Sequence, residues 1–153
     1  MTTVAHTRTA TSPLSASPAR VAAAVFGVVF LAVGVLGFVP GVTSNLDDIR
    51  FLGHESGAEL LGLFQVSILH NLVHALFGVA GLVAARTAGT STGYLIGGGV
   101  VYFLLTAYGL VIDHGSTANF VPVNGADNLL HFALGVAMVG VGLAVRARPS
   151  AAS

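Results

Sequence analysis

The sequence predicts an all-α membrane protein with four transmembrane helices, built as two tandem parallel helical hairpins. Only 8% of its 153 residues are charged and 54% are hydrophobic, whereas soluble domains carry about a quarter charged residues. Long apolar segments recur along the chain, and two of them contain the same short motif. So few charges cannot solvate a globular surface or neutralise phosphate groups, which excludes an ordinary cytosolic enzyme and a nucleic-acid binder.

The first and third spans are predicted from almost continuous apolar segments. Residues 21–39 follow Arg20, and residues 94–112 are interrupted only by Thr106. As helices, segments of this length cross about 30 Å of hydrocarbon. No small-x-small cleavage site follows the first span, so we expect it to be retained rather than removed as a signal peptide.

The second and fourth spans are predicted over residues 67–85 and 124–145. Both segments are apolar in their second halves and carry Asn and His in their first turns. Ahead of the second span, residues 56–59 (Ser-Gly-Ala-Glu) form a capping-box pattern, which predicts a short interfacial helix. Whether residues 56–86 form one helix or two stays open at this stage.

Residues 20–146 are thus expected to form the transmembrane domain, between a disordered cytoplasmic tail over residues 1–19 and a second tail over residues 147–153. Basic and acidic side chains separate between the two sides of the predicted membrane domain, with Arg50 as the one basic residue on the acidic side. The basic side chains on one side are Arg8, Arg20, Arg86, Arg146 and Arg148, and the acidic ones on the other are Asp47, Asp48, Glu55, Glu59, Asp113 and Asp127. The positive-inside rule therefore predicts a multi-pass plasma-membrane protein with cytoplasmic N- and C-termini.

An internal repeat relates the two halves of the chain. Residues 71–80 and 128–137 match at Asn, Leu, His, Gly, Val and Ala, and residues 27–30 resemble residues 99–102. Because each hairpin would start on the same side, the two would be related by a pseudo-twofold axis along the membrane normal. The small and polar stripes on the second and fourth helices predict that these two helices pack together.

Residues 69–78, which include His-Asn-Leu-Val-His, and residues 124–135, which include Asn-Gly-Ala-Asp-Asn-Leu-Leu-His, also resemble a known family. They are similar to an actinobacterial membrane family described as domain of unknown function 4383 (DUF4383). The resemblance extends over about residues 20–146 and implies a four-helix membrane protein. It implies no activity. Ser67 stands where many relatives would have Asn, and it retains the capping role.

The paired Asn-x-x-His motifs favour a structural polar cluster. Asn71, His74, Asn128 and His131 are expected to hydrogen-bond to one another between the second and fourth helices. This interpretation predicts a protein of structural or protein-interaction role, with no enzymatic activity, no catalytic residues and no cofactor. Its expected partners are the lipid bilayer and other membrane proteins or a second copy of the chain, and no nucleic acid.

Two alternatives assign a ligand to the same region. His70, His74, Asp127 and His131 lie at i, i+4 spacings on two helices and together suit Zn²⁺ or another divalent first-row metal. Asp127 has an alternative role as the N3 residue of its helix cap. Alternatively, His74 and His131 could be the axial ligands of a haem held between the second and fourth helices. The chain contains no Cys, which excludes disulfides, iron–sulfur clusters and Cys-type zinc sites.

Overall fold

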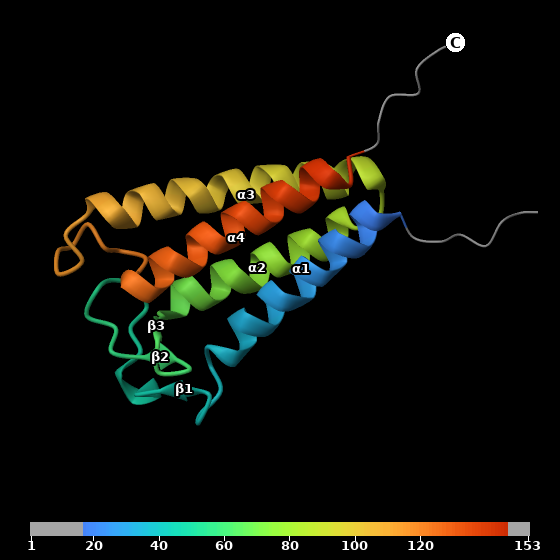
Figure 1. Ribbon diagram of the computed structural model, residues 1–153. Coiled ribbons are helices and arrows are strands. Elements are labelled where there is room, and N and C mark those ends of the chain that lie inside the picture. The colour runs from blue at the N-terminus through green and yellow to red at the C-terminus, as the bar shows by residue number, and fades with distance from the viewer. Residues whose placement is uncertain (1–16, 147–153) are drawn as a thin grey trace, which may run out of the picture.

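The computed structural model describes residues 17–146, which are mostly helical. The four helices are α1 (Pro18–Leu36), α2 (Ile68–Ala84), α3 (Ala88–Val111) and α4 (Gly125–Ala144). They lie side by side, with a small β-sheet at one end of the bundle and both ends of the described chain at the other (Figure 1). We call the sheet end the head. Apart from residues 17–19, the tails predicted over residues 1–19 and 147–153 lie outside the described residues.

Capping residues set where the helices begin. The side chains of Ser67, Thr87 and Asn124 each accept a hydrogen bond from the backbone N–H three residues further on. Side-chain caps of this kind satisfy N–H groups that have no partner within the helix. The Thr87 cap starts α3 earlier than the predicted residue 94. The first helix ends at Leu36, short of the predicted residue 39, and the chain then turns into the head.

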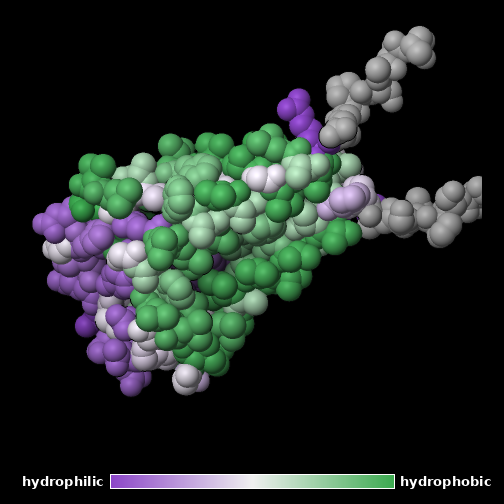
Figure 2. Space-filling model, in the orientation of Figure 1, coloured by the Kyte–Doolittle hydropathy of each residue, from purple (hydrophilic) through white to green (hydrophobic). Residues whose placement is uncertain are grey.

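Three of the helices, α1, α3 and α4, are long and apolar enough to cross a membrane. The fourth, α2, has 17 residues and is also apolar. Hydrophobic residues cover the sides of the bundle in the view of Figure 2, and hydrophilic residues gather over the head. This distribution is that of a membrane protein with one polar end.

Close helix packing occurs mainly within each hairpin, between α1 and α2 and between α3 and α4. A Cβ added at Gly78 of α2 would lie 2.7 Å from the Gly27 carbonyl oxygen of α1, and one added at Gly99 of α3 would lie 3.0 Å from the Gly135 carbonyl oxygen of α4. The prediction that α2 and α4 pack along one another is therefore wrong. Their small-residue stripes face the neighbouring helix of the same hairpin, and α1 and α3 make the larger contact between hairpins.

The head contains a three-stranded antiparallel sheet in the order β1 (Thr43–Ser44), β2 (Glu59–Leu60) and β3 (Phe64–Gln65). Thr43 pairs with Leu60, which also pairs with Phe64. A short 3₁₀ helix, η1 (Leu46–Asp48), follows β1. Ala58, Leu60 and Val66 form a small apolar core beneath the sheet.

The short helix predicted from Ser56 is wrong. The Ser56 hydroxyl donates to the Val66 carbonyl oxygen at 2.6 Å, so it holds the ends of a β-hairpin together instead of capping a helix. Leu61 and Gly62 both have positive φ values, 57° and 67°, and form the turn between β2 and β3. Residues 56–86 thus contain the β-hairpin of β2 and β3, followed by a single helix that starts at Ile68.

Candidate metal centre

The head ends of α2 and α4 bring three histidines together. One ring nitrogen from each of His70, His74 and His131 lies within 4.8 Å of the other two. The His70 and His74 rings, one turn apart on α2, are stacked with centroids 4.6 Å apart, and the His131 ring of α4 is 6.3 Å from that of His70. All three side chains are buried, with at most 8% of their surface exposed. We call these residues the histidine cluster.

Backbone carbonyls orient two of the rings. His70 Nδ1 is 3.2 Å from the Pro122 carbonyl oxygen, and His74 Nδ1 is 3.0 Å from the His70 carbonyl oxygen. A carbonyl oxygen only accepts, so in each case Nδ1 carries the hydrogen. In a neutral imidazole this leaves the Nε2 lone pair available. Metal-binding histidines are commonly oriented by such a bond from the nitrogen that does not bind the metal.

The third ring has a buried nitrogen with no partner. His131 Nδ1 makes no hydrogen bond to any part of the chain that the structure describes. Leaving a buried polar atom unpaired costs about 1–3 kcal/mol. An unpaired nitrogen beside two other imidazoles is therefore a polar position that a ligand could satisfy.

Aromatic side chains enclose the histidine cluster. The rings of Phe30 (α1) and Tyr102 (α3) stack on one another with centroids 5.4 Å apart. Phe30 is 6.0 Å from the His74 ring, and Tyr102 is 5.3 Å from the His131 ring. Every helix thus contributes a ring to this region. The space beside His74 and His131 is filled by these rings, so the arrangement fits a single metal ion better than a porphyrin plane.

Asp127, the fourth member of the predicted metal set, has another role. Its buried Oδ2 accepts hydrogen bonds from the backbone N–H of Asn124 at 2.9 Å and of Gln65 at 3.1 Å. The first bond completes the capping box of α4, and the second ties β3 to the start of that helix. The structure therefore brings together the three predicted histidines without this carboxylate.

The predicted mutual bonding of the four Asn and His side chains is wrong. Among residues 17–146, no hydrogen bond joins any two of Asn71, His74, Asn128 and His131. The Asn71 side chain instead donates to the carbonyl oxygen of Gly37, the C-cap of α1, at 2.9 Å. Asn128 lies against Gly109 of α3, and its Oδ1 is buried without a partner in the described chain. Each Asn faces its own hairpin because that is where the helices pack closely.

Sequence reasoning did not find the Pro122 carbonyl or the two enclosing aromatic rings. Pro122 precedes α4 by only a few residues, yet nothing in its sequence context indicates that its carbonyl faces His70. The i, i+4 spacing of His70 and His74 was the one local signal for the cluster. The match between His74 and His131 in the two motifs supplied the third member.

Comparison with known proteins identifies a family. The family model described as Domain of unknown function (DUF4383) matches residues 20–144. This match covers most of the chain, which therefore belongs to that family. No curated protein and no solved structure shows significant similarity to it.

Proposed function

We propose that this member of the DUF4383 family is a four-span membrane protein that binds one divalent first-row transition metal ion, best matched by Zn²⁺, through the histidine cluster. The observation that carries the proposal is the convergence of three buried imidazole nitrogens within 4.8 Å. Imidazole is the commonest protein ligand for such metals. The ion would join α2 to α4 and so connect the two hairpins. We assign no catalytic activity to the ion.

The geometry needs little change to accept the ion. Zn²⁺ binds imidazole nitrogen at about 2.0–2.1 Å, which places tetrahedral ligands about 3.3 Å apart. Side-chain rotations that close the histidine cluster by about 1.5 Å would reach this spacing from the observed limit of 4.8 Å. Three protein ligands leave a fourth position for water or an external ligand. The bonds from His70 and His74 to backbone carbonyls already orient two of the three rings.

The proposed topology places all four helices across the membrane. With its 17 residues, α2 is at the short end of the range for a span, about 25 Å long. The even number of spans agrees with both ends of the described chain lying at the same end of the bundle (Figure 1). The acidic residues lie in or beside the head loops and Arg20, Arg86 and Arg146 at the opposite end. We therefore orient the head outward and the termini toward the cytoplasm, in the plasma membrane.

The proposed tandem arrangement is supported by matched contacts in the two hairpins. Asn71 of α2 lies against Gly37 at the C-cap of α1, and Asn128 of α4 lies against Gly109 of α3. These are the residue pairs that the repeat of the sequence would equate. The two halves would then carry equivalent interfaces, with the histidine cluster bridging them at the head end.

The proposal is tested by metal titration of the full chain in detergent, after treatment with EDTA. Co²⁺ binding is followed by its visible absorption, and Zn²⁺ content is measured by elemental analysis after gel filtration. We expect one ion per chain in the natural protein. His74→Gln and His131→Gln should each weaken binding by about 100-fold or more, since even outer residues of metal sites contribute 10- to 100-fold.

His54→Gln is the matched control, because His54 lies in the head outside the histidine cluster. This variant should bind one ion with unchanged affinity. Circular dichroism at 222 nm verifies that each variant is folded. If the natural protein binds no more tightly than a folded His74→Gln/His131→Gln double variant, the metal proposal is wrong.

A further inference from the structure

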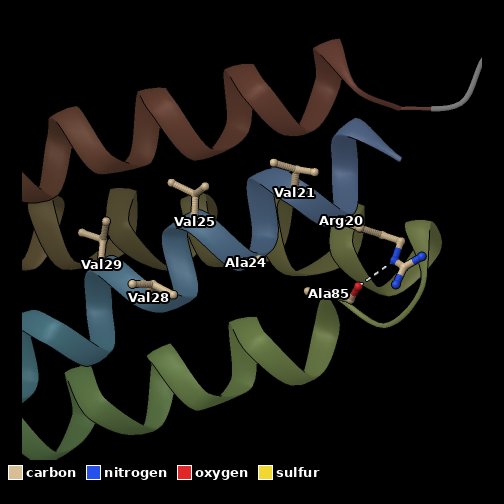
Figure 3. A pocket seen from close by; sticks show the side chains of 7 residues that line it. All are labelled: Arg20, Val21, Ala24, Val25, Val28, Val29 and Ala85. Atoms are coloured by element: carbon tan, nitrogen blue, oxygen red, sulfur yellow. Dashed lines mark hydrogen bonds between the residues drawn. The ribbon is translucent and has the colours of Figure 1, made fainter. Parts of the chain in front are cut away.

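An apolar groove follows α1 at the end of the bundle opposite the head (Figure 3). Its volume is about 490 Å³. The lining residues are Arg20, Val21, Ala24, Val25, Val28, Val29 and Ala85. The four valines are each about half exposed. The groove is therefore apolar along its length, lies on the membrane-facing surface, and has a single charged residue, Arg20, at its end.

Arg20 is held in place by the end of α2. Its Nε donates to the Ala85 carbonyl oxygen at 2.9 Å. Ala85 is the C-cap of α2, where carbonyl groups carry partial negative charge. Among residues 17–146, this is the one hydrogen bond that the guanidinium of Arg20 makes (Figure 3). Arginine has five N–H donors in a planar fork, so four of them have no partner within the described part of the chain and could bind a ligand.

The charge of Arg20 has no acidic counterpart at its end of the bundle. All six Asp and Glu residues of the sequence lie in or beside the head loops, between positions 47 and 127. Arg86 and Arg146 lie at the same end as Arg20. Among residues 17–146, this end therefore carries positive side chains without a neighbouring carboxylate.

We propose that the groove binds one anionic phospholipid, with the phosphate on Arg20 and one acyl chain along Val21, Val25 and Val29. Basic pockets beside transmembrane helices bind anionic head groups, and a planar guanidinium can bind phosphate through two parallel hydrogen bonds. From Arg20 to Val29 the helix rises about 14 Å, enough to cover a large part of an acyl chain. This site requires only that α1 lies in a membrane, and it is independent of metal binding.

The test compares phosphatidylglycerol with phosphatidylcholine. The full chain, freed of lipid in detergent, is titrated with each, and bound lipid is counted by native mass spectrometry. The natural protein should hold one phosphatidylglycerol about fivefold more tightly than phosphatidylcholine, since a basic residue near the membrane contributes about 1 kcal/mol toward anionic lipid. Arg20→Gln should abolish this preference.

Two further variants test the two ends of the site. Arg86→Gln makes the same change of charge at an exposed residue outside the groove, and it should retain the preference. Val25→Trp fills the groove at a residue that is 55% exposed, and it should weaken binding of both lipids while the protein stays folded. Equal affinity for the two lipids in the natural protein, equal losses in Arg20→Gln and Arg86→Gln, or unchanged binding by Val25→Trp would each overturn the proposal.

Discussion

The asparagines of the two Asn-x-x-His motifs have different hydrogen bonding. Asn71 donates to the Gly37 carbonyl oxygen, whereas Asn128 Oδ1 is buried without a partner in the described chain. In membrane proteins, hydrogen bonds between helices contribute about 0.6–2 kcal/mol. One residue type thus stabilises one helix pair and leaves a polar atom unpaired in the other.

This difference predicts unequal effects of one substitution. Asn71→Leu removes a bond between α1 and α2 and should lower the free energy of unfolding by about 1–2 kcal/mol. Asn128→Leu is the matched control. It removes a buried oxygen that has no partner in the described chain, so it should leave the free energy of unfolding unchanged or raise it. Denaturation in mixed micelles, followed by circular dichroism, measures both. Equal losses in the two variants would mean that Asn128 has a bonding partner equivalent to that of Asn71.

At the scale of the helices, glycines set how closely the two members of a hairpin approach. A Cβ added at Gly78 of α2 would meet the backbone of α1 at Gly27 and Leu31, where no flexible side chain can move aside. Gly140 of α4 is also helical, but a Cβ added there meets nothing within 4 Å. The two positions therefore separate the effect of close contact from that of helix propensity.

Gly78→Ala should accordingly destabilise the protein by about 1–3 kcal/mol, because an extra methyl group in a packed interface forces the backbones apart. Gly140→Ala should stabilise it by up to about 1 kcal/mol, since alanine is the better helix former. Thermal unfolding in detergent compares the two variants with the natural protein. A stabilised Gly78→Ala variant would show that α1 and α2 are not in backbone contact.

The number of helices followed from the apolar segments, because each of the four predicted segments forms one helix. Which helices pack against each other did not follow from the sequence. A stripe of small residues defines a face of a helix without saying which neighbour packs there, so α2 was assigned to α4 although it packs on α1. The β-hairpin was also missed. Its Ser56 bond to Val66 joins residues ten positions apart, and Leu61 is an unusual residue for positive φ.

For the histidine cluster, too, the spacing of residues along the chain was informative, whereas contacts between distant parts of the chain could not be predicted. The spacing of His70 and His74 placed both on one face of a helix. The similarity of the two Asn-x-x-His motifs then indicated His131 as a third candidate ligand. Asp127 was included on the same spacing rule, but its local capping interaction with Asn124 prevailed. Sequence spacing identified candidate ligands, and only the packing of four helices showed which of them converge.

For the whole molecule, the two ends of the bundle differ in charge and in structure. The head carries the acidic loops, the small sheet and the proposed metal site, whereas the opposite end carries Arg20, Arg86 and Arg146. Since α2 and α4 do not pack along one another, the histidine cluster and the contact between α1 and α3 are expected to hold the hairpins together. A metal ion in the cluster would therefore stabilise the folded chain by an amount that rises with the logarithm of its concentration relative to its Kd.

The orientation of the bundle in the membrane can be measured with single-cysteine variants because the chain contains no Cys. A single Cys introduced at an exposed loop position then reports one location. Thr117 lies at the head between α3 and α4, and Gly89 lies at the opposite end in the first turn of α3, where an added Cβ meets nothing within 4 Å.

In intact cells, a membrane-impermeant maleimide should label the Thr117→Cys variant and leave Gly89→Cys unlabelled until the cells are lysed. This outcome follows from the excess of arginine at the Gly89 end, which the positive-inside rule keeps in the cytoplasm. Labelling of Gly89→Cys alone would invert the orientation, and labelling of both variants in intact cells would contradict a bundle whose two ends lie on opposite sides of the membrane.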